Sequence, residues 1–352
     1  MKIVTIVGAR PQFIKEAVVG EELRKAGFKH ILIHTGQHYD YNMSDVFFRS
    51  LEIKDPDYNL GVGSGTHAVQ TGLTMIRLEE VIIKEKPDIV LVYGDTNATV
   101  AGALVSAKLK IPVAHVEAGM RQEPRDMPEE INRVLTDRMS DFLLCPSRTA
   151  VENLQKEGVE KGIWFTGDVM YDLYLKMEEY FDYSTVERLS LKENEYVVVT
   201  IHRDFNTDSK ERLETILKQL SLVAKEKRAV FPIHPRTRKR IQEFHLDNYL
   251  RHFSVVNPLD YPEMMGLVKL SWKVVTDSGG LQKESYFAGK QAVVVMPDTS
   301  WIELIKRGIN SLSEPGEIYE KLFSVGDNTF EKDLYGSGNA GALIAKTLGG
   351  SE

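Results

Sequence analysis

Two carboxylates in the stretch VYGDTNATVAGALVSAKLKIPVAHVEAGMR, residues 92–121, follow apolar runs that have the length and composition of strands. Asp95 comes two residues after IVLVY, and Glu117 comes directly after PVAHV. Carboxylates in such positions can transfer protons or offset positive charge in a bound molecule. An alternative for Asp95 is that it caps the following helix, with Thr96 and Asn97 assisting. That alternative suits Glu117 less, because a glycine turn follows it.

Reactive groups end three further apolar runs in the same way. They are His202 and Arg203 after YVVVTI, His234 and Arg236 after AVFPI, and Asp277 to Gly280 after KVVT. The last run continues through Ser-Gly-Gly into a helix that carries Glu284, and the N–H groups and positive end of such a helix suit a phosphate. A tight turn that uses glycine only for its backbone freedom is the alternative. Both interpretations stay open for this segment taken alone.

The first apolar run, KIVTIV, leads into GARPQFIK, where the cations Arg10 and Lys15 flank a turn. Only Gly8 remains of a Gly-x-Gly-x-x-Gly fingerprint, so a dinucleotide pocket of the usual kind is not predicted. The position at the carboxyl end of a strand favours an anion contact, with solvated surface charges as the alternative. The basic run RTRKR is expected to be mostly solvated, and only Arg236 lies close enough to a strand end to contact an anion.

Short apolar runs alternate along the chain with longer amphipathic segments. We expect strands at residues 2–7, 30–35, 88–94, 112–117, 141–146, 163–167, 196–202, 229–235, 253–256, 273–277 and 291–296. Helical patterns lie between them, at residues 13–25, 68–84, 98–109, 128–139 and 210–225.

This alternation predicts an α/β fold. Strands that are apolar throughout and separated by helices indicate doubly wound parallel sheets covered on both faces. Roughly eleven strands are too many for one typical sheet, so two Rossmann-like domains are expected, with a break near residues 169–190. Ligands bind beyond the carboxyl ends of the strands in such sheets, so Asp95 and Glu117 are expected to face a bound molecule.

Composition limits the partners. The formal net charge of −7 argues against nucleic acid or an anionic membrane as the main partner, although a local Arg and Lys cluster can still bind phosphate. The single cysteine, Cys145, excludes an internal disulfide and a cysteine-based zinc cluster. No apolar run reaches the ~18 residues that a membrane span needs. We therefore expect a cytoplasmic protein.

Seven segments carry a resemblance when they are taken in order along nearly the whole chain. They are GARPQFIK, TGQHYDYNMSDVFF, YGDTNATVAGALVSAKLKIPVAHVEAGMR, MPEEINRVLTDRMSD, TGDVMYD, TIHR and VTDSGGLQKE. Together they resemble the non-hydrolysing UDP-N-acetylglucosamine 2-epimerases. The stretch NLGVGSGTHAVQTG and the short loop before MPEE are similar to the subgroup that includes UDP-2,3-diacetamido-2,3-dideoxyglucuronate 2-epimerases. That subgroup also includes UDP-N-acetylglucosamine 2-epimerases, so the substrate stays open.

The resemblance implies the GT-B fold, two Rossmann-like domains with the nucleotide sugar in the cleft and a final helix that crosses back. The expected domains are then residues 1–168 with 336–352, and residues 169–335, with 336–348 as the returning helix. Matched position by position, the catalytic set is Asp95, Glu117, Glu129 and His202. The matching UDP-binding set is Arg10, Lys15, His234, Ser278, Gly279, Gly280 and Glu284, to which the strand-end position adds Arg236. A homodimer is also implied.

The family reaction explains why acids are needed. The hydrogen on C2 of an N-acetylhexosamine is not next to a carbonyl, so direct deprotonation is too costly. In the family the C1–O bond breaks, UDP leaves, and the C2 proton is removed as a 2-acetamidoglucal forms; UDP adds back after reprotonation of C2 from the opposite face. We expect the three acids of the catalytic set to transfer protons and offset charge, and His202 and Arg10 to assist UDP departure. Which acid is the base stays open, and no metal or redox cofactor is needed.

Other functions remain possible on these residues. They include a 2-epimerase of a UDP-2,3-diacetamido-uronate or another UDP-amino sugar, a hydrolysing relative, a GT-B glycosyltransferase and a non-catalytic UDP-sugar binder. A transferase has no evident use for paired Asp95 and Glu117, and a binder would tolerate neutral residues there. The retained acids favour an epimerase.

The chain also departs from the family pattern. The sequence MPDTSW places Met296 and Ser300 where relatives carry an arginine and a glutamate, and Asp204 and Phe205 replace a small or basic residue and a glutamate. These changes indicate an altered substrate or altered regulation, with loss of activity as the alternative. Gln37 and His38 match an allosteric site of bacterial members, but the loops that follow them differ.

Overall fold

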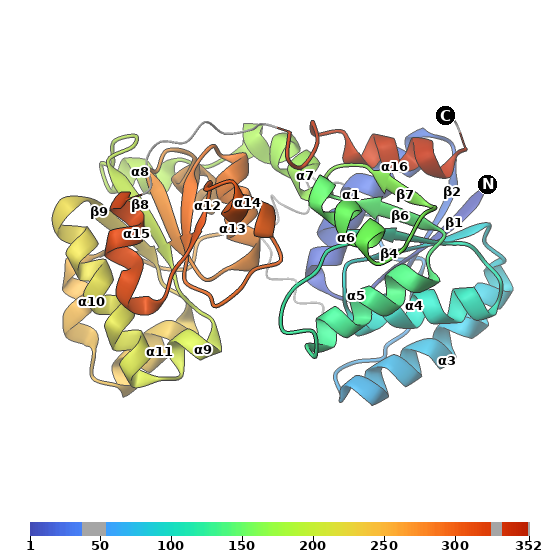
Figure 1. The fold of residues 1–352 in the computed structure, drawn as a ribbon, viewed down its shortest axis with the longest axis horizontal. Helices are drawn as coiled ribbons and strands as arrows, with labels where there is room; N and C mark the ends of the chain where they lie inside the picture. Colours follow the sequence, from blue (N-terminus) through green and yellow to red (C-terminus); the bar gives the residue numbers. More distant parts are fainter. Residues whose placement is uncertain (37–53, 325–332, 351–352) are drawn as a thin grey trace. The chain divides into compact units, whose positions relative to one another are not determined.

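The structure, a computed structural model, describes residues 1–36, 54–324 and 333–350. Gln37, His38 and the side chain of Arg10 lie outside this described part. The chain divides into two compact units, Met1–Lys176 with Lys332–Glu352, and Met177–Glu331 (Figure 1).

The first unit is built on a parallel sheet with the strand order β3-β2-β1-β4-β5-β6-β7. Its strands are β1 (Lys2–Val7), β2 (Lys29–His34), β3 (Tyr58–Asn59), β4 (Ile89–Tyr93), β5 (Val113–Val116), β6 (Phe142–Cys145) and β7 (Ile163–Phe165). This is a Rossmann-type order, and it makes β4 and β5 direct neighbours.

Helices cover both faces of this sheet (Figure 1). They are α1 (Arg10–Lys25), α3 (His67–Glu85), α4 (Asn97–Lys108), α5 (Pro128–Met139), α6 (Arg148–Lys156), α7 (Val169–Met177) and α16 (Ala340–Leu348). Helices α3, α4 and α5 pack side by side on one face, and α1 packs against α16 on the other. Branched apolar residues of β1, β2 and β4 fill the core beneath α3 and α4.

The second unit repeats the plan with the strand order β10-β9-β8-β11-β12-β13, again parallel. Its strands are β8 (Tyr196–Thr200), β9 (Arg228–Pro232), β10 (Ser254–Val256), β11 (Lys273–Thr276), β12 (Gln291–Val294) and β13 (Ser311–Leu312). The carboxyl ends of β8, β9 and β11 therefore meet at one edge of the sheet.

The helices of the second unit also lie on both faces of its sheet (Figure 1). The α-helices are α8 (Ser184–Arg188), α9 (Asp204–Thr207), α10 (Lys210–Glu226), α11 (Pro235–Glu243), α12 (Tyr261–Lys269), α13 (Gly279–Phe287), α14 (Ile302–Lys306) and α15 (Ile318–Ser324). Short 3₁₀ turns lie at Glu178–Tyr180, Asp247–His252 and Pro315–Glu317. Helices α10 and α15 enclose the main core against the sheet.

All eleven expected strands are present, and the structure adds the two-residue edge strands β3 and β13. Two residues are too few to form a recognisable apolar run, so the sequence did not predict these strands. The final helix begins at Ala340, four residues later than expected, because Gly336 and Gly338 adopt positive φ values of 83° and 78°.

The unit boundaries also differ from the expected domain limits of 168/169 and 335/336. Most of α7 belongs to the first unit. Its Asp172 accepts hydrogen bonds from the backbone N–H groups of Ala340 (3.0 Å) and Gly341 (2.8 Å) at the start of α16. Lys176 bonds to Glu21 of α1 at 2.5 Å. These bonds join α7 to the first unit. Among the described residues, no helix combines the length and apolar character needed to cross a membrane.

Candidate active site

Asp95 and Glu117 lie at the carboxyl ends of the neighbouring strands β4 and β5, just after Tyr93 and Val116, which are paired in register. The backbone turns sharply at both ends, since Gly94 has a φ of 59° and Glu117 a φ of 71°. A β-carbon on Gly94 would lie 3.2 Å from Oε2 of Glu117. Glycine at position 94 therefore permits the positive φ and leaves room for the Glu117 carboxylate. The topology brings the two predicted acids to one edge of the sheet.

Lys15 of α1 forms an ion pair with Glu117, and both side chains are largely buried. Burial opposes the charge of Lys15, but the Glu117 carboxylate, with weaker contributions from Asp168 and Asp95, raises the pKa of Lys15 above its ordinary value. The predicted cation and the predicted acid are therefore in direct contact, and the ammonium stays charged among three carboxylates.

Asp95 is held by a different cation, Arg133 of α5. Nη2 of Arg133 donates to the Asp95 carboxylate at 2.5 Å, and Nη1 donates to Glu130 at 2.8 Å. Arginine remains protonated in proteins, so a permanent positive charge lies against Asp95. The cap of α4 is Thr96, whose hydroxyl accepts from the N–H of Thr99. The alternative that Asp95 caps this helix is therefore wrong.

The adjacent acids of α5 have different surroundings. Glu129 is exposed, and within the described part of the chain it makes no hydrogen bond or ion pair. Glu130 is buried, bonded to Arg133 and to the backbone N–H of Gln122 at 3.1 Å. The match of the segment MPEE to the family pattern had placed Glu129 in the predicted catalytic set. The helical period could have indicated Glu130, because it shares a face with Arg133 and Asp137.

The turn after β1 is occupied by a side chain of its own helix. Oε1 of Gln12 accepts from the backbone N–H groups of Gly8 (2.7 Å) and Ala9 (3.0 Å). Its Nε2 donates to the carbonyl of Tyr93 (2.6 Å) and the hydroxyl of Thr99 (2.9 Å). These amides therefore bind Gln12, which agrees with the missing dinucleotide fingerprint. Gln12 joins the Arg10 and Lys15 turn to the end of β4.

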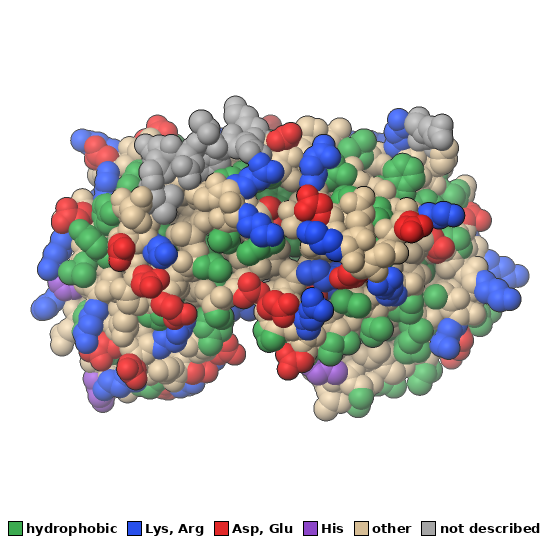
Figure 2. All heavy atoms as spheres, viewed as in Figure 1, with side chains coloured by type: hydrophobic (Ala, Val, Ile, Leu, Met, Phe, Trp, Pro, Cys, Tyr) green, Lys and Arg blue, Asp and Glu red, His purple; other side chains and the backbone are tan. Residues whose placement is uncertain are grey.

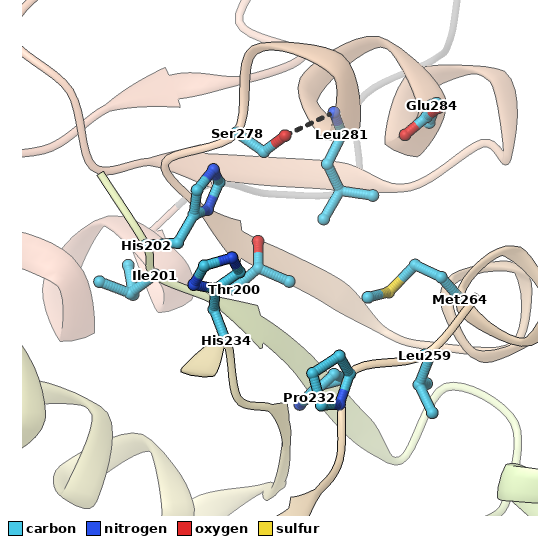
Figure 3. A pocket seen from close by; sticks show the side chains of 11 residues that line it. Thr200, Ile201, His202, Pro232, His234, Leu259, Met264, Ser278, Leu281 and Glu284 are labelled. Carbon is cyan, nitrogen blue, oxygen red and sulfur yellow. Dashed lines mark hydrogen bonds between the residues drawn. The ribbon is translucent and has the colours of Figure 1, made fainter. Parts of the chain in front are cut away.

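The second unit contains a cavity of about 330 Å³ beyond the carboxyl ends of β8 and β9 (Figure 3). Its lining consists of Thr200, Ile201, His202, Pro232, His234, Pro258, Leu259, Met264, Ser278, Leu281 and Glu284. Four predicted residues are thus brought together. Arg236 is not part of the lining, since its guanidinium donates to Asp208 at 2.7 Å on the surface of the unit.

Two histidines lie side by side in this cavity, with ring centroids 5.7 Å apart (Figure 3). Nδ1 of His202 lies 3.0 Å from the completely buried carboxylate of Asp277. Nδ1 of His234 accepts the backbone N–H of Arg236, so this nitrogen carries no proton. Burial, then the neighbouring His202 and Arg236, lowers the pKa of His234. The pair therefore combines a carboxylate-bound imidazole with one that is held neutral.

Asp277 also shapes the loop that carries His202. Its carboxylate accepts from the backbone N–H groups of His202 and Arg203 and from Nδ2 of Asn206, each at 3.0 Å. Asp277 was expected at a strand end but was not among the predicted site residues. A buried carboxylate beside the Ser-Gly-Gly segment was the available signal.

The Ser278 hydroxyl accepts from the N–H of Leu281 at 3.4 Å and caps α13 (Figure 3). Neither Gly279 nor Gly280 has a positive φ, so this turn does not require glycine for its backbone conformation. A β-carbon on Gly280 would lie 3.9 Å from Oε2 of Glu284. The bare Cα atoms instead leave the helix N-terminus accessible, which favours the anion interpretation over the turn interpretation.

Glu284 is half-buried on the second turn of α13. Burial raises the pKa of its carboxyl to about 7, and Lys283 opposes that rise only partly. No group in the described residues hydrogen-bonds to this carboxyl. It is therefore available to a ligand, in an ionisation state that changes near neutral pH.

The segment MPDTSW packs on the start of α13. Sδ of Met296 accepts from Nε2 of Gln282 at 3.4 Å, and Nε1 of Trp301 donates to the carbonyl of Gly279 at 3.0 Å. Nζ of Lys283 lies 3.7 Å from the centre of the Trp301 ring. Met296, one of the two departures in this segment, therefore contacts α13 directly. Asp204 and Phe205, the second departure, are exposed on α9.

Comparison with known proteins identifies the family. The family model described as UDP-N-acetylglucosamine 2-epimerase matches residues 21–349. The chain belongs to the UDP-N-acetylglucosamine 2-epimerase family. The UDP-N-acetylglucosamine 2-epimerase homolog of Methanococcus maripaludis is 46% identical over 358 residues, 99% of each chain. The UDP-2,3-diacetamido-2,3-dideoxy-D-glucuronate 2-epimerase of Pseudomonas aeruginosa is 44% identical with the same coverage.

Solved structures of the epimerase family share the fold. The Methanocaldococcus jannaschii UDP-GlcNAc 2-epimerase, crystallised in complex with UDP-GlcNAc and UDP, has a TM-score of 0.84 and 38% identity over 99% of each chain. The family, the GT-B fold and the assignment to the epimerases that the sequence predicted are confirmed. Within the described ranges, no group of three His, Cys, Asp or Glu residues is arranged to hold a metal ion.

Proposed function

We propose that this epimerase interconverts UDP-GlcNAc and UDP-ManNAc by eliminating UDP and adding it back. The observation that carries the proposal is the pair of strand-end acids, each bonded to its own cation, Glu117 to Lys15 and Asp95 to Arg133. Breaking the C1–O bond releases UDP and leaves positive charge at C1; loss of the C2 proton gives the 2-acetamidoglucal. Reprotonation of C2 from the other face and return of UDP to C1 complete the exchange.

The two ion pairs suit different tasks. The Arg133 guanidinium does not release its proton, so Asp95 beside it is suited to offset the charge at C1 or to accept the C2 proton. Lys15 beside Glu117 stays charged, so Glu117 is a carboxylate and is the second candidate to accept or return a proton at C2. The exposed Glu129 is retained as a third candidate because its segment matches the family pattern.

The UDP part is proposed to bind in the cavity of the second unit. The N-terminus of α13 with Ser278, Gly279 and Gly280 suits the diphosphate, and Glu284 suits the ribose hydroxyls. His202 and His234 lie near enough to each other to contact one phosphate group together. Arg10 and Lys15 are proposed to add positive charge for the leaving diphosphate.

Proton NMR in deuterated water tests this proposal. UDP-GlcNAc is incubated with the purified protein, and its C2 signal is followed over time. Deuterium at C2 together with UDP-ManNAc supports the proposal. Free N-acetylmannosamine and UDP would instead indicate a hydrolysing enzyme. Binding of UDP without exchange would rule out UDP-GlcNAc as a substrate.

A UDP-2,3-diacetamido-uronate is the second candidate substrate. The 44% identical relative that is named for this sugar supports it, as does the contact of Met296, which departs from the family pattern, with Gln282 of α13. The same NMR assay with that UDP-sugar discriminates between the two. Faster C2 exchange on the uronate than on UDP-GlcNAc would assign the chain to it.

We further propose that the enzyme is a cytoplasmic homodimer. In the first unit α3 exposes Val69, Ile76 and Ile83 at seven-residue spacing, which places them on one side of the helix. The exposed Ile131 and Leu135 lie on α5 in the same helical layer, where Figure 2 shows hydrophobic side chains at the surface. Light scattering at several concentrations tests the dimer, with Ile76→Glu as the variant expected to dissociate it. Cys145 is a buried free thiol, as suits a reducing compartment.

A further inference from the structure

His115 lies at the centre of β5 and is completely buried. Its Nδ1 lies 2.7 Å from a carboxylate oxygen of Asp137 on α5, and its Nε2 lies 2.8 Å from the carbonyl oxygen of Gly94. Both ring nitrogens therefore face oxygen atoms. This matters for Asp95, because Gly94 is the residue directly before it.

Neutral histidine has one N–H group and one bare nitrogen, so it can donate only one hydrogen bond. A carbonyl oxygen has no proton to give, so Nε2 of His115 must be the donor to Gly94. Nδ1 can then meet Asp137 in two ways. Either His115 carries a second proton and donates to a carboxylate, or Asp137 is protonated and donates to a bare Nδ1.

The surroundings of Asp137 favour the carboxylate. Its second oxygen accepts from the backbone N–H of Gly119 (3.1 Å) and from Nη1 of Arg121 (2.7 Å). Burial raises the pKa of Asp137, whereas the charge and hydrogen bond of Arg121 lower it, and a carboxyl that accepts from a guanidinium and a backbone N–H favours its ionised form. The proton that the pair shares therefore belongs on His115.

The charges of this cluster balance. Nε and Nη2 of Arg121 donate to Glu157 at 2.6 and 2.8 Å, so with both nitrogens of His115 protonated two cations and two carboxylates would alternate from Glu157 to His115. A buried charge is tolerated when it is paired and hydrogen-bonded in this way. Cys145 stays a thiol because burial raises its pKa. The charges of Asp137 and Arg121 affect this pKa less.

A second branch of the same network reaches Asp95 itself. Nε of Arg121 lies 3.9 Å from Glu130, which is bonded to Arg133, and Arg133 is bonded to the Asp95 carboxylate. The backbone before Asp95 and the side chain of Asp95 are thus both tied to Arg121. We propose that His115 donates from both ring nitrogens, to the Asp137 carboxylate and to the Gly94 carbonyl, and that its bond to Gly94 positions Asp95 for proton transfer. The positioning part of this proposal depends on the proposed function, and the protonation part does not.

The protonation state can be measured on the whole protein with ¹⁵N-labelled histidine. At pH 7.5, both ring nitrogens of His115 are expected to carry directly bonded, slowly exchanging protons. The signals are assigned by their loss in His115→Gln. His234 is the control in the same spectrum, because its Nδ1 accepts a backbone N–H and is expected to be bare. A bare Nδ1 on His115 would overturn the proposal, whether or not the protein is an epimerase.

The positioning role is tested by turnover in two backgrounds. His115→Phe removes both donors and is expected to lower kcat roughly 10- to 100-fold with little change in KM, while His115→Gln, which keeps an amide donor, recovers part of the loss. In the Asp95→Asn background the same change is expected to cost much less, because the effect acts through Asp95. Equal losses in both backgrounds would show a general structural role instead. If His115→Phe does not fold, His115→Gln in both backgrounds provides the comparison.

Discussion

Nδ1 of His202 lies 3.0 Å from the Asp277 carboxylate, which has no exposed surface and also accepts the backbone N–H of His202. One buried group therefore holds both the main chain and the ring of the histidine. This leaves Nε2 of His202 as the nitrogen available to a ligand in the cavity (Figure 3). A protonated ring in this arrangement can donate to a departing phosphate while Asp277 stabilises its charge.

Asp277→Asn is therefore expected to lower kcat by about 100-fold, because the amide keeps the shape but does not stabilise an imidazolium. Epimerisation is measured at saturating substrate, with the melting temperature as the folding control. In the His202→Ala background the substitution should add little, because the group through which Asp277 acts is gone. A full further loss in that background would show that Asp277 acts on the loop and not on His202.

Glu117→Gln is expected to reduce turnover by roughly 100-fold or more while UDP affinity stays near that of the parent. The reason is that glutamine cannot transfer a proton, whereas the nucleotide is proposed to bind in the second unit. NMR of samples quenched at successive times measures turnover, and isothermal titration calorimetry measures UDP affinity. Lys15→Met, which removes the paired cation, should weaken UDP binding as well as turnover. Unchanged turnover in Glu117→Gln would remove this acid from the mechanism.

Adjacent acids of α5 offer a matched test of stability. Glu130→Ala leaves the largely buried Arg133 without one of its two carboxylates, so we expect a loss of about 3 kcal/mol in the free energy of unfolding. Glu129→Ala removes an exposed side chain that has no described partner and should change stability by less than about 0.5 kcal/mol. Urea denaturation measures both. Similar losses at the two positions would contradict the burial difference.

Glu284 predicts a pH dependence of nucleoside binding. Burial raises its pKa to about 7, so the carboxylate that would accept the ribose hydroxyls is mostly absent at pH 6 and mostly present at pH 8. Uridine, which has no phosphate to titrate in this range, should bind about tenfold more tightly at pH 8 than at pH 6. Glu284→Gln should abolish this difference. A parent protein that binds uridine equally at both pH values would exclude the ribose role.

Asp172 predicts a pH dependence of stability. Its pKa is raised to about 6, mainly by burial, against an ordinary value of 3.8, although the N–H groups of Ala340 and Gly341 favour its carboxylate. A folded state with the higher pKa binds the proton more tightly, so this contribution is fully present below pH 3.8 and is lost as pH rises through 6. Asp172→Asn removes that slope. The difference in unfolding free energy between parent and variant should therefore change by about 1 to 3 kcal/mol between pH 4.5 and 7. A constant difference across this range would mean that Asp172 titrates normally.

The sequence by itself determined where the strands lie along the chain and which reactive groups end them. Continuous apolar runs mark buried parallel strands, and the polar residues that end them must lie at one edge of a parallel sheet. Asp95, Glu117, His202 and Ser278 were predicted in this way, and the ordered segments were specific enough to predict the family. Edge strands as short as β3 and β13 leave no such pattern.

Tertiary structure alone decided which partner each of these groups has. Arg133 bonds to Asp95 from 38 residues away, His115 to Asp137 from 22, and the His202 amide to Asp277 from 75. A local pattern cannot contain such pairs, because the packing of α5 against the first sheet and the pairing of β8 with β11 in the second bring them together. The same packing placed Glu130 inside and Glu129 outside, and it directed Arg236 to Asp208. The positions of the strands along the chain thus follow from local hydrophobic patterning. The ionisation and positioning of the side chains at the strand ends depend on contacts that only the folded chain makes.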